Sequence, residues 1–235
     1  MTIAVVIPTL NEEAAIGHTV RRTAGLGFDE IVVVDGGSQD QTRAIVAAVT
    51  SECQRSIGAK IHLLVAPPGR ARQLNEGAKA CRSDALLFLH ADTSLPATAK
   101  RAIESALTDP AVGGGRFDVE FDSASRWGSV ISFFMNARSR LTRIATGDQG
   151  LFVRRTVFEQ LGGFPDVPLM EDIEFSRRLK RGWMIAALRE KVITSFRRWE
   201  RWGPLRTILL MWALRFLYWL GVSPHRLQRF YAAVR

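Results

Sequence analysis

A histidine and an aspartate follow a short apolar run in the stretch LLFLHADTSLP. The run Leu86–Leu89 precedes His90, Ala91 and Asp92. Polar groups at the carboxyl end of a buried parallel strand lie where α/β sheets bind their ligands. The same residues could instead end the strand with a turn and cap a helix over Ala97–Leu107. The stretch is therefore a candidate binding site with a purely structural alternative.

A second carboxylate ends another apolar run, in VVVDGGSQDQT. Asp35 is followed by Gly36 and Gly37, which let the backbone approach a ligand closely while the carboxylate accepts hydrogen bonds from a base or ribose. The spacing is not that of a phosphate-gripping dinucleotide loop, and no G-K-[ST] is present, which disfavours Rossmann dehydrogenases and P-loop enzymes. Alternatively, Asp35 and Ser38 form a turn that caps the next helix.

Adjacent carboxylates occur in MEDIEFSRRL, at Glu171 and Asp172. If both are partly desolvated, the like charges raise the pKa of one of them toward working pH, which suits a general base. An acidic first helical turn stabilised by the helix macrodipole is the alternative explanation.

Cationic and amide side chains open a helix in PPGRARQLNEG, at Arg70, Arg72 and Gln73. Because they follow a predicted strand, they could meet phosphate groups of a ligand. Ordinary arginines on a helix surface are an equally good interpretation.

The first half of the chain alternates apolar runs with helical stretches. These elements would position the candidate side chains named above. The runs IAVVIP, EIVVVDG, KIHLLVA and DALLFLHA are typical of strands covered on both faces. This βαβ series predicts an α/β fold with a mainly parallel central sheet flanked by helices. The loops after the strands then gather at one edge, where we expect the ligand crevice. The predicted helices cover Glu12–Ala24, Gln41–Val49 and Ala71–Cys81.

The second half is less regular, and no repeat or low-complexity linker interrupts it. We expect one domain over residues 1–195 and a basic, apolar helical segment over residues 196–235. The further strands and helices predicted there are Gly113–Phe121, Arg126–Leu141, Gly150–Arg155 and Glu171–Arg181.

The composition, with 47% hydrophobic residues among 235, indicates a globular protein. Its net charge of +9 is concentrated in residues 176–235, which carry +12 while residues 1–175 carry −3. A solvated basic face, a nucleic-acid surface and a surface for anionic lipids or phosphate-bearing ligands all fit this charge. Cys53 and Cys81 form neither a metal motif nor a disulfide framework, and MTIAVVIPTL resembles a first strand rather than a signal peptide, which predicts a cytoplasmic protein.

The segment Gly203–Gly221 is apolar except for Arg206 and Arg215. The sixteen-residue stretch TILLMWALRFLYWLGV, residues 207–222, is shorter than the roughly 20 apolar residues that span a membrane. We expect a C-terminal apolar helix that packs on the domain, pairs two subunits in a homodimer, or makes peripheral contact with the inner face of the membrane.

Five motifs in order, VVIPTLNEE, VVVDGGSQDQT, FLHADT, GGF and MEDIEFSRRL, resemble those of family 2 glycosyltransferases of the GT-A fold, over Ile3–Leu179. PPGRARQLNEGA, GDQGLFVRR and RRWERWGPLRT are similar to a small bacterial subgroup of arsenosugar-biosynthesis-type glycosyltransferases. The resemblance implies a nucleotide-sugar-binding fold.

On the donor side, the resemblance implies that the D-x-D element falls on His90, Ala91 and Asp92, with Asp92 holding Mn²⁺ or Mg²⁺. His90 replaces the usual Asp of that element, so metal preference stays open. Gly36 also stands where many relatives carry a second Asp. The residues implied to bind the nucleotide base and ribose are Pro8, Thr9, Asn11, Glu12 and Asp35.

On the acceptor side, the resemblance implies that Asp172 is the general base and that Glu171 orients the acceptor. SFRRWE is similar to a Q-x-x-R-W element with Ser195 in place of Gln, which implies diphosphate or acceptor contacts. The remaining residues assigned to the diphosphate or acceptor are Asp148, Gln149, Arg198 and Trp199.

These observations predict an inverting, metal-dependent glycosyltransferase that moves a sugar from a UDP- or GDP-linked donor to a hydroxyl acceptor. A nucleotidyltransferase is the alternative enzyme, but it would normally open with a Gly-rich, Arg- or Lys-bearing loop after the first strand. A nucleic-acid-binding module using the basic tail would leave Asp35, Asp92 and Asp172 unexplained, so no nucleic-acid partner is expected.

Overall fold

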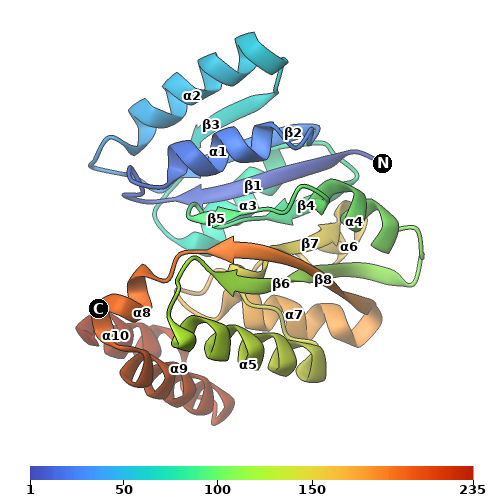
Figure 1. Cartoon of the computed structure of the whole chain (residues 1–235). Helices are drawn as coiled ribbons and strands as arrows, with labels where there is room; N and C mark the ends of the chain where they lie inside the picture. Colours follow the sequence, from blue (N-terminus) through green and yellow to red (C-terminus); the bar gives the residue numbers. More distant parts are fainter. Residues whose placement is uncertain (235) are drawn as a thin grey trace.

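The computed structural model describes residues 1–234, and side chains through residue 231. Within that range the strands form a single eight-stranded sheet in the order β3-β2-β1-β4-β7-β6-β8-β5, flanked by helices (Figure 1). The predicted α/β class with flanking helices is confirmed. The strands are β1 (Ile3–Thr9), β2 (Glu30–Asp35), β3 (Ile61–Val65), β4 (Ala85–Phe88), β5 (Thr93–Ser94), β6 (Val112–Phe121), β7 (Leu151–Arg154) and β8 (Met184–Thr194).

The sheet is mixed, so the prediction of a mainly parallel sheet is wrong. Strands β3, β2, β1 and β4 run parallel, as the βαβ series requires. Strand β7 then lies antiparallel between β4 and β6, and β5 is antiparallel to β8, while β6 and β8 are parallel. An apolar run indicates that a strand is buried but not its direction, which depends on how the chain returns to the sheet.

Helices cover both faces of the parallel half. Side chains of β1 alternate, so Ile3 and Val5 face one core while Ala4 and Val6 face the other. The first core contains α1 and α2, and the second contains α3 with Phe175. The helices that precede the C-terminal segment are α1 (Ile16–Ala24), α2 (Thr42–Ile57), α3 (Arg70–Ala80), α4 (Ala99–Ala106), α5 (Arg126–Thr142), α6 (Arg155–Gln160) and α7 (Glu171–Gly182).

The chain ends in helices α8 (Arg197–Trp202), α9 (Pro204–Trp219) and α10 (Pro224–Val234), drawn in orange to red-brown in Figure 1. Leu214 of α9 and Leu227 of α10 are buried together with Met170, which precedes α7. Among the described residues, no helix is both long enough and apolar enough to cross a bilayer. The division of the chain at residue 195 stays a prediction.

Candidate active site

The parallel strands carry polar residues at their carboxyl ends, as expected for an α/β ligand site. Thr9 ends β1, Asp35 ends β2, and the two are register partners. His90 follows β4, the neighbour of β1 on its other side. The sequence therefore places these predicted residues at one edge of the sheet.

Asp35 is fully buried and is held by its own loop. Its Oδ1 accepts hydrogen bonds from the N–H groups of Gly37 at 3.1 Å and Ser38 at 3.0 Å. The hydroxyl of Ser38 donates to its Oδ2 at 2.5 Å and accepts from the N–H of Asn11 at 2.9 Å. The structural alternative for Asp35, a turn-forming carboxylate, is thus realised; nucleotide binding by Asp35 stays a prediction.

Gln73 joins the ends of β1 and β2. Its buried side-chain amide donates to the carbonyls of Thr9 and Val34, both at 2.8 Å. A Cβ at Gly36 would lie 2.9 Å from Nε2 of Gln73, so only glycine fits there without displacing this amide. Gln73 therefore links the carboxyl ends of β1 and β2. Arg72 instead pairs with Asp166 at 2.9 Å, outside the polar cluster described next.

Five predicted residues do meet in one polar cluster, on α3, the loop after β4, the short 3-10 helix η1 (Gly147–Gln149) and α7. Nδ1 of His90 lies 3.0 Å from Oδ1 of Asp148, and its Nε2 contacts the guanidinium of Arg70. Nη1 of Arg70 lies 3.1 Å from Oε1 of Glu171. Next to Glu171, Asp172 accepts a hydrogen bond from the N–H of Gly147 at 2.8 Å.

Burial and neighbouring charges shift the pKa values of two carboxyl groups in this cluster. Burial raises the pKa of Glu171, and the neighbouring charge of Asp172 raises it further, while Arg70 partly opposes both. The pKa of Asp148 is lowered, because the hydrogen bond and charge of His90 and the charges of Arg198 and Arg70 outweigh its burial. Glu171 thus holds its proton more firmly than a free carboxyl group, and Asp148 is held as a carboxylate.

Asp92 points to a different set of partners from His90. Its Oδ2 lies 3.6 Å from Nη2 of Arg197, and the same nitrogen lies 3.5 Å from Oε2 of Glu12. Burial and then the charge of Asp92 raise the pKa of Glu12, and Arg197 partly opposes them. The guanidinium of Arg197 therefore bridges two carboxylates, while Ala91 between His90 and Asp92 is buried and accepts a hydrogen bond from Thr19.

The fit of this site to a divalent cation rests on Asp92 and Glu12. Within the described part of the chain, no three His, Cys, Asp or Glu residues are grouped to hold a metal ion. Mg²⁺ usually takes one or two protein carboxylates and completes its shell with water and substrate phosphates. The carboxylates at hand fit a cation that is bound together with a diphosphate, rather than one caged by protein alone.

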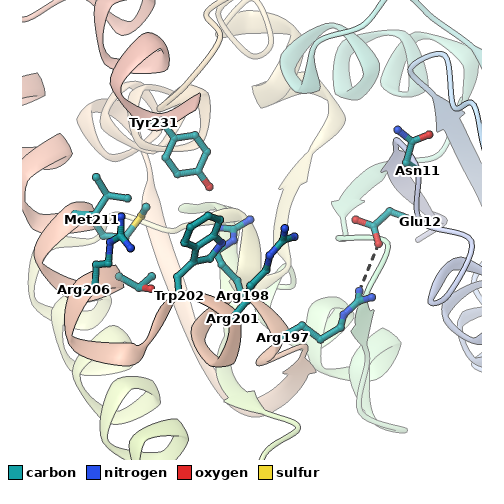
Figure 2. A pocket seen from close by; sticks show the side chains of 11 residues that line it. Asn11, Glu12, Arg197, Arg198, Arg201, Trp202, Arg206, Met211 and Tyr231 are labelled. Carbon is teal, nitrogen blue, oxygen red and sulfur yellow. Dashed lines mark hydrogen bonds and ion pairs between the residues drawn. The ribbon is translucent and has the colours of Figure 1, made fainter. Parts of the chain in front are cut away.

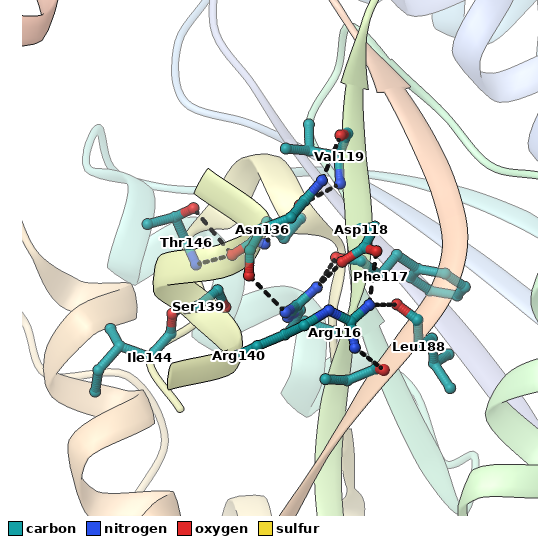
Figure 3. A network of polar contacts seen from close by, with 12 residues as sticks. Arg116, Phe117, Asp118, Val119, Asn136, Ser139, Arg140, Ile144, Thr146 and Leu188 are labelled. Carbon is teal, nitrogen blue, oxygen red and sulfur yellow. Dashed lines mark hydrogen bonds and ion pairs between the residues drawn. The ribbon is translucent and has the colours of Figure 1, made fainter. Parts of the chain in front are cut away.

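A buried hydrogen-bond network positions the turn that carries Asp148 (Figure 3). Gln149 is fully buried; its Oε1 accepts from the N–H of Thr146 at 3.2 Å, and its Nε2 donates to Asn136 of α5 at 3.4 Å. Asn136 is itself bound to both backbone groups of Val119 in β6, at 2.9 and 3.0 Å. Gln149 is therefore placed to support Asp148.

The network continues below Asn136. The fully buried Arg116 donates to the carbonyls of Phe117 at 3.1 Å and Asn136 at 3.3 Å, and it pairs with Asp118. Arg140 of α5 donates to the other oxygen of Asp118 at 2.6 Å. These contacts fix α5 against the sheet.

The predicted residues of α8 separate into two environments. Trp199 packs on Phe121 and stacks on Phe196, with ring centroids 5.9 and 6.2 Å apart. Arg198 instead lines a cavity of about 410 Å³ between α8, α9, α10 and the loop after β1 (Figure 2). Pro8 lines a much smaller hollow beside Arg70, His90 and Asp172.

Two further arginines near the cluster were not predicted. Arg138 of α5 buries its Nε and Nη2 without a hydrogen-bond partner in the described structure, and burial followed by the charge of Arg215 lowers its pKa to about 10. Arg215 of α9 and Arg138 both feel the charges of Asp148 and Asp172. The sequence around Arg138 contains no motif that predicts a functional role for it. The arginine-rich stretch RRWERW, by contrast, does indicate a cationic site near α8.

The sequence model of a protein family, described as Glycosyl transferase family 2, matches residues 4–162 of this chain. The β-monoglucosyldiacylglycerol synthase of Synechocystis sp. is 24% identical over 231 residues, covering 86% of this chain and 47% of that protein. The undecaprenyl-phosphate 4-deoxy-4-formamido-L-arabinose transferase of Pseudomonas paraeruginosa is 32% identical over 160 residues, covering 65% and 46%. The chain thus spans about half the length of these curated relatives.

Solved structures share the fold at low identity. A mannosyltransferase from Pyrobaculum calidifontis in complex with GDP-Man and Mn²⁺ superposes with a TM-score of 0.63 at 22% identity, covering 81% of this chain and 56% of that one. Glucosyl-3-phosphoglycerate synthase from Mycobacterium tuberculosis in complex with Mg²⁺ and uridine diphosphate gives 0.56 at 20% identity, covering 81% and 69%. These likenesses concern the arrangement of helices and strands.

Proposed function

The chain belongs to glycosyltransferase family 2, and we propose that it transfers a sugar from a UDP- or GDP-linked donor to a hydroxyl acceptor with inversion at the anomeric carbon. One observation carries this proposal: Asp172 lies in the first turn of α7, inside a cluster with Arg70 and His90, next to the strand ends where a donor would lie. The assignment to the arsenosugar-biosynthesis-type subgroup stays a prediction from its motifs.

The donor would lie along the carboxyl ends of β1, β2 and β4. The loop after β1 supplies Asn11 and Glu12, and β2 ends in Asp35. Arg70, whose pKa is raised because the charges of Glu171, Asp172 and Asp148 outweigh its burial, remains a cation available to phosphate oxygens. The solved relatives that hold GDP-Man or uridine diphosphate support a nucleotide-sugar donor.

Inversion requires a base on the face of the sugar opposite the leaving group. In the proposed step, Asp172 takes the proton of the acceptor hydroxyl, and the acceptor oxygen forms a bond to the anomeric carbon. The bond from that carbon to the diphosphate breaks, and its electron pair leaves with the nucleoside diphosphate. The hydrogen bond from Gly147 to Oδ2 fixes the carboxylate, and Glu171 beside it would orient the acceptor.

We assign the metal to Asp92, with Glu12 close by. Mn²⁺ or Mg²⁺ bound there would supply charge neutralisation to the leaving diphosphate. Because Arg197 bridges the two carboxylates, it would have to release Asp92 as the cation and the donor bind.

The apolar face of α9 supports peripheral membrane contact. Leu205, Leu209, Trp212, Phe216 and Trp219 recur at intervals of four and three residues, and each is 58 to 71% exposed. We call this set the α9 stripe. Its setting in a segment of net charge +12 favours an anionic lipid surface over a second copy of the chain, which would bring like charges together.

A donor screen tests the proposed reaction. The protein would be incubated with UDP- and GDP-linked sugars, with and without Mn²⁺, while release of nucleoside diphosphate is recorded. At least one donor should be turned over in the presence of metal. The configuration of the product, determined by NMR, should be opposite to that of the donor. Retention would contradict the inverting mechanism, and inertness toward every donor would contradict the activity.

A further inference from the structure

The cavity beside α8 carries more positive charge than its surroundings neutralise. Arg197, Arg198, Arg201 and Arg206 line it, and Figure 2 shows them spread from Arg206 near Met211 to Arg197 next to Glu12. Arg197 pairs with Glu12. No carboxylate of the described residues lies within ion-pair distance of the other three guanidinium groups. Excess charge of this kind favours a ligand that carries more than one negative charge.

Trp202 organises two of these arginines. The guanidinium of Arg201 lies 5.4 Å from the centroid of its ring, and that of Arg206 lies 5.6 Å from it. Cation–π contacts of this length hold the two groups near the ring while leaving their N–H donors free for other partners. Planar guanidinium donors suit the oxygens of a phosphate group, which accept pairs of hydrogen bonds.

The same cavity has an apolar side. Leu210 and Met211 of α9 line it, about one helical turn after Arg206 and Thr207. A ligand anchored by its anionic group at the arginines would therefore lay an uncharged part against α9. The α9 stripe occupies the adjoining outer face of the same helix.

The position of the cavity links it to both halves of the active site. Glu12, at one end of the cavity, belongs to the loop after β1, which we assign to the donor site. The charge of Arg198, which also lines the cavity, helps to lower the pKa of Asp148, which shares a cluster with Asp172. The cavity therefore lies beside the loop after β1, and the charge of one of its arginines reaches the cluster that contains the predicted base.

We propose that this cavity binds the acceptor through a phosphate group held by Arg198, Arg201 and Arg206, with the remainder of the acceptor against Leu210 and Met211. The proposal rests on the glycosyltransferase function and names the class of acceptor. The phosphate belongs either to a soluble phosphate ester or to a lipid, because the cationic and apolar sides of the cavity fit both.

Direct binding tests this site without turnover. Calorimetry would compare glycerol 3-phosphate, a soluble ester, with dihexanoyl phosphatidic acid below its micelle concentration, and glycerol would serve as the phosphate-free control. The double variant R201Q/R206Q removes the two arginines that flank Trp202. The matched control R82Q/R101Q removes two exposed arginines that do not line the cavity, one from the loop after α3 and one from α4. Melting curves would show that both variants are folded.

We expect one of the phosphate probes to bind. R201Q/R206Q should weaken the affinity for that probe by about 10-fold or more, because each charge-assisted hydrogen bond contributes substantially to the free energy of binding. R82Q/R101Q should bind as the wild type does. Preference for glycerol 3-phosphate would identify a soluble ester, and preference for the phosphatidic acid a lipid acceptor; either result supports the site.

Three results would overturn the proposal. The first is that neither phosphate probe binds, and the second is that R82Q/R101Q weakens probe binding as much as R201Q/R206Q does. The third is that R201Q/R206Q weakens the binding of UDP and GDP as much as it weakens the binding of the phosphate probe. The last would place the arginines in the donor site. Failure of the donor screen with intact phosphate binding would instead contradict the proposed reaction and leave the anion site standing.

Discussion

The main-chain N–H of Gly147 donates a 2.8 Å hydrogen bond to Oδ2 of Asp172. This bond ties the turn that carries Asp148 to the first residues of α7. Gly147 also lies directly against Arg70 and His90, so that a Cβ at this position would overlap both side chains. The absence of a side chain at residue 147 thus lets the cluster close.

We expect Gly147→Ala to reduce transfer by about 10-fold or more while changing the free energy of unfolding by only about 1 kcal/mol. The atoms that a methyl group would meet belong to the ends of side chains that can move, but moving them separates Arg70 and His90 from their partners. Gly182→Ala is the matched control, because nothing lies within 4 Å of a Cβ there. Unchanged turnover by Gly147→Ala would contradict a role for the closed cluster.

We expect Asp92→Asn to weaken nucleoside-diphosphate binding in Mn²⁺ and to change it little in chelator. The neutral amide is a poorer ligand for a hard cation than a carboxylate. Asp166→Asn serves as the control, since Asp166 pairs with Arg72 at 2.9 Å outside the cluster. If chelator leaves the wild-type affinity unaltered, the metal assignment is wrong.

The stability of Glu171→Gln relative to the wild type should increase with pH from about pH 4 to pH 7. The pKa of Glu171 is raised above its usual 4.5 by burial and by Asp172, so the folded state holds this proton more firmly than the unfolded state. Wild-type stability from this group is therefore present below pH 4.5 and lost as the pH rises toward the folded pKa. Glutamine does not titrate and shows no such loss. Chemical unfolding of both proteins at each pH measures the difference; a parallel pH dependence would contradict the raised pKa.

Replacing Trp212 and Phe216 of the α9 stripe by Gln should abolish co-sedimentation with anionic vesicles, and high salt should weaken the wild-type binding. Phe133→Gln with Phe134→Gln removes two equally exposed aromatic residues from α5 and should leave binding intact. A concentration-dependent dimer that ignores vesicles would place the stripe in a subunit contact instead.

The local sequence predicted which polar residues lie at the carboxyl ends of the parallel strands, because an apolar run and the polar residue that ends it are close together in the chain. Asp35 and His90 follow such runs and do lie at the ends of β2 and β4, the strands on either side of β1. The separate directions of His90 and Asp92 were not predictable, because they depend on Asp148 and Arg197, which are 58 and 105 residues away from them in the sequence. Contacts across the sheet, rather than residue types, decide where each side chain points.

The second half of the sheet was harder to predict for a related reason. Strand β8 (Met184–Thr194) contains Arg189, Glu190 and Lys191, and most of its residues are partly or fully exposed, so its sequence lacks the continuous apolar run of β1 or β4. The direction of β7 likewise follows from its antiparallel pairing with β4 and β6. Gln73 and Gln149 had the sequence context of ligand-binding residues, yet both are committed to buried hydrogen bonds that support the neighbouring loops.

The most direct test of the account is turnover by Asp172→Asn at matched donor occupancy, with Glu171→Gln measured beside it. Asparagine keeps the shape of the side chain and one oxygen, which can accept from Gly147 but not also from Ile173 as the second carboxylate oxygen does, and it cannot take the acceptor proton. We expect donor affinity to be preserved while kcat falls by about 10²-fold or more, and Glu171→Gln to lose less. Near-normal kcat in Asp172→Asn would contradict its role as the base and transfer that role to Asp148 or Glu171.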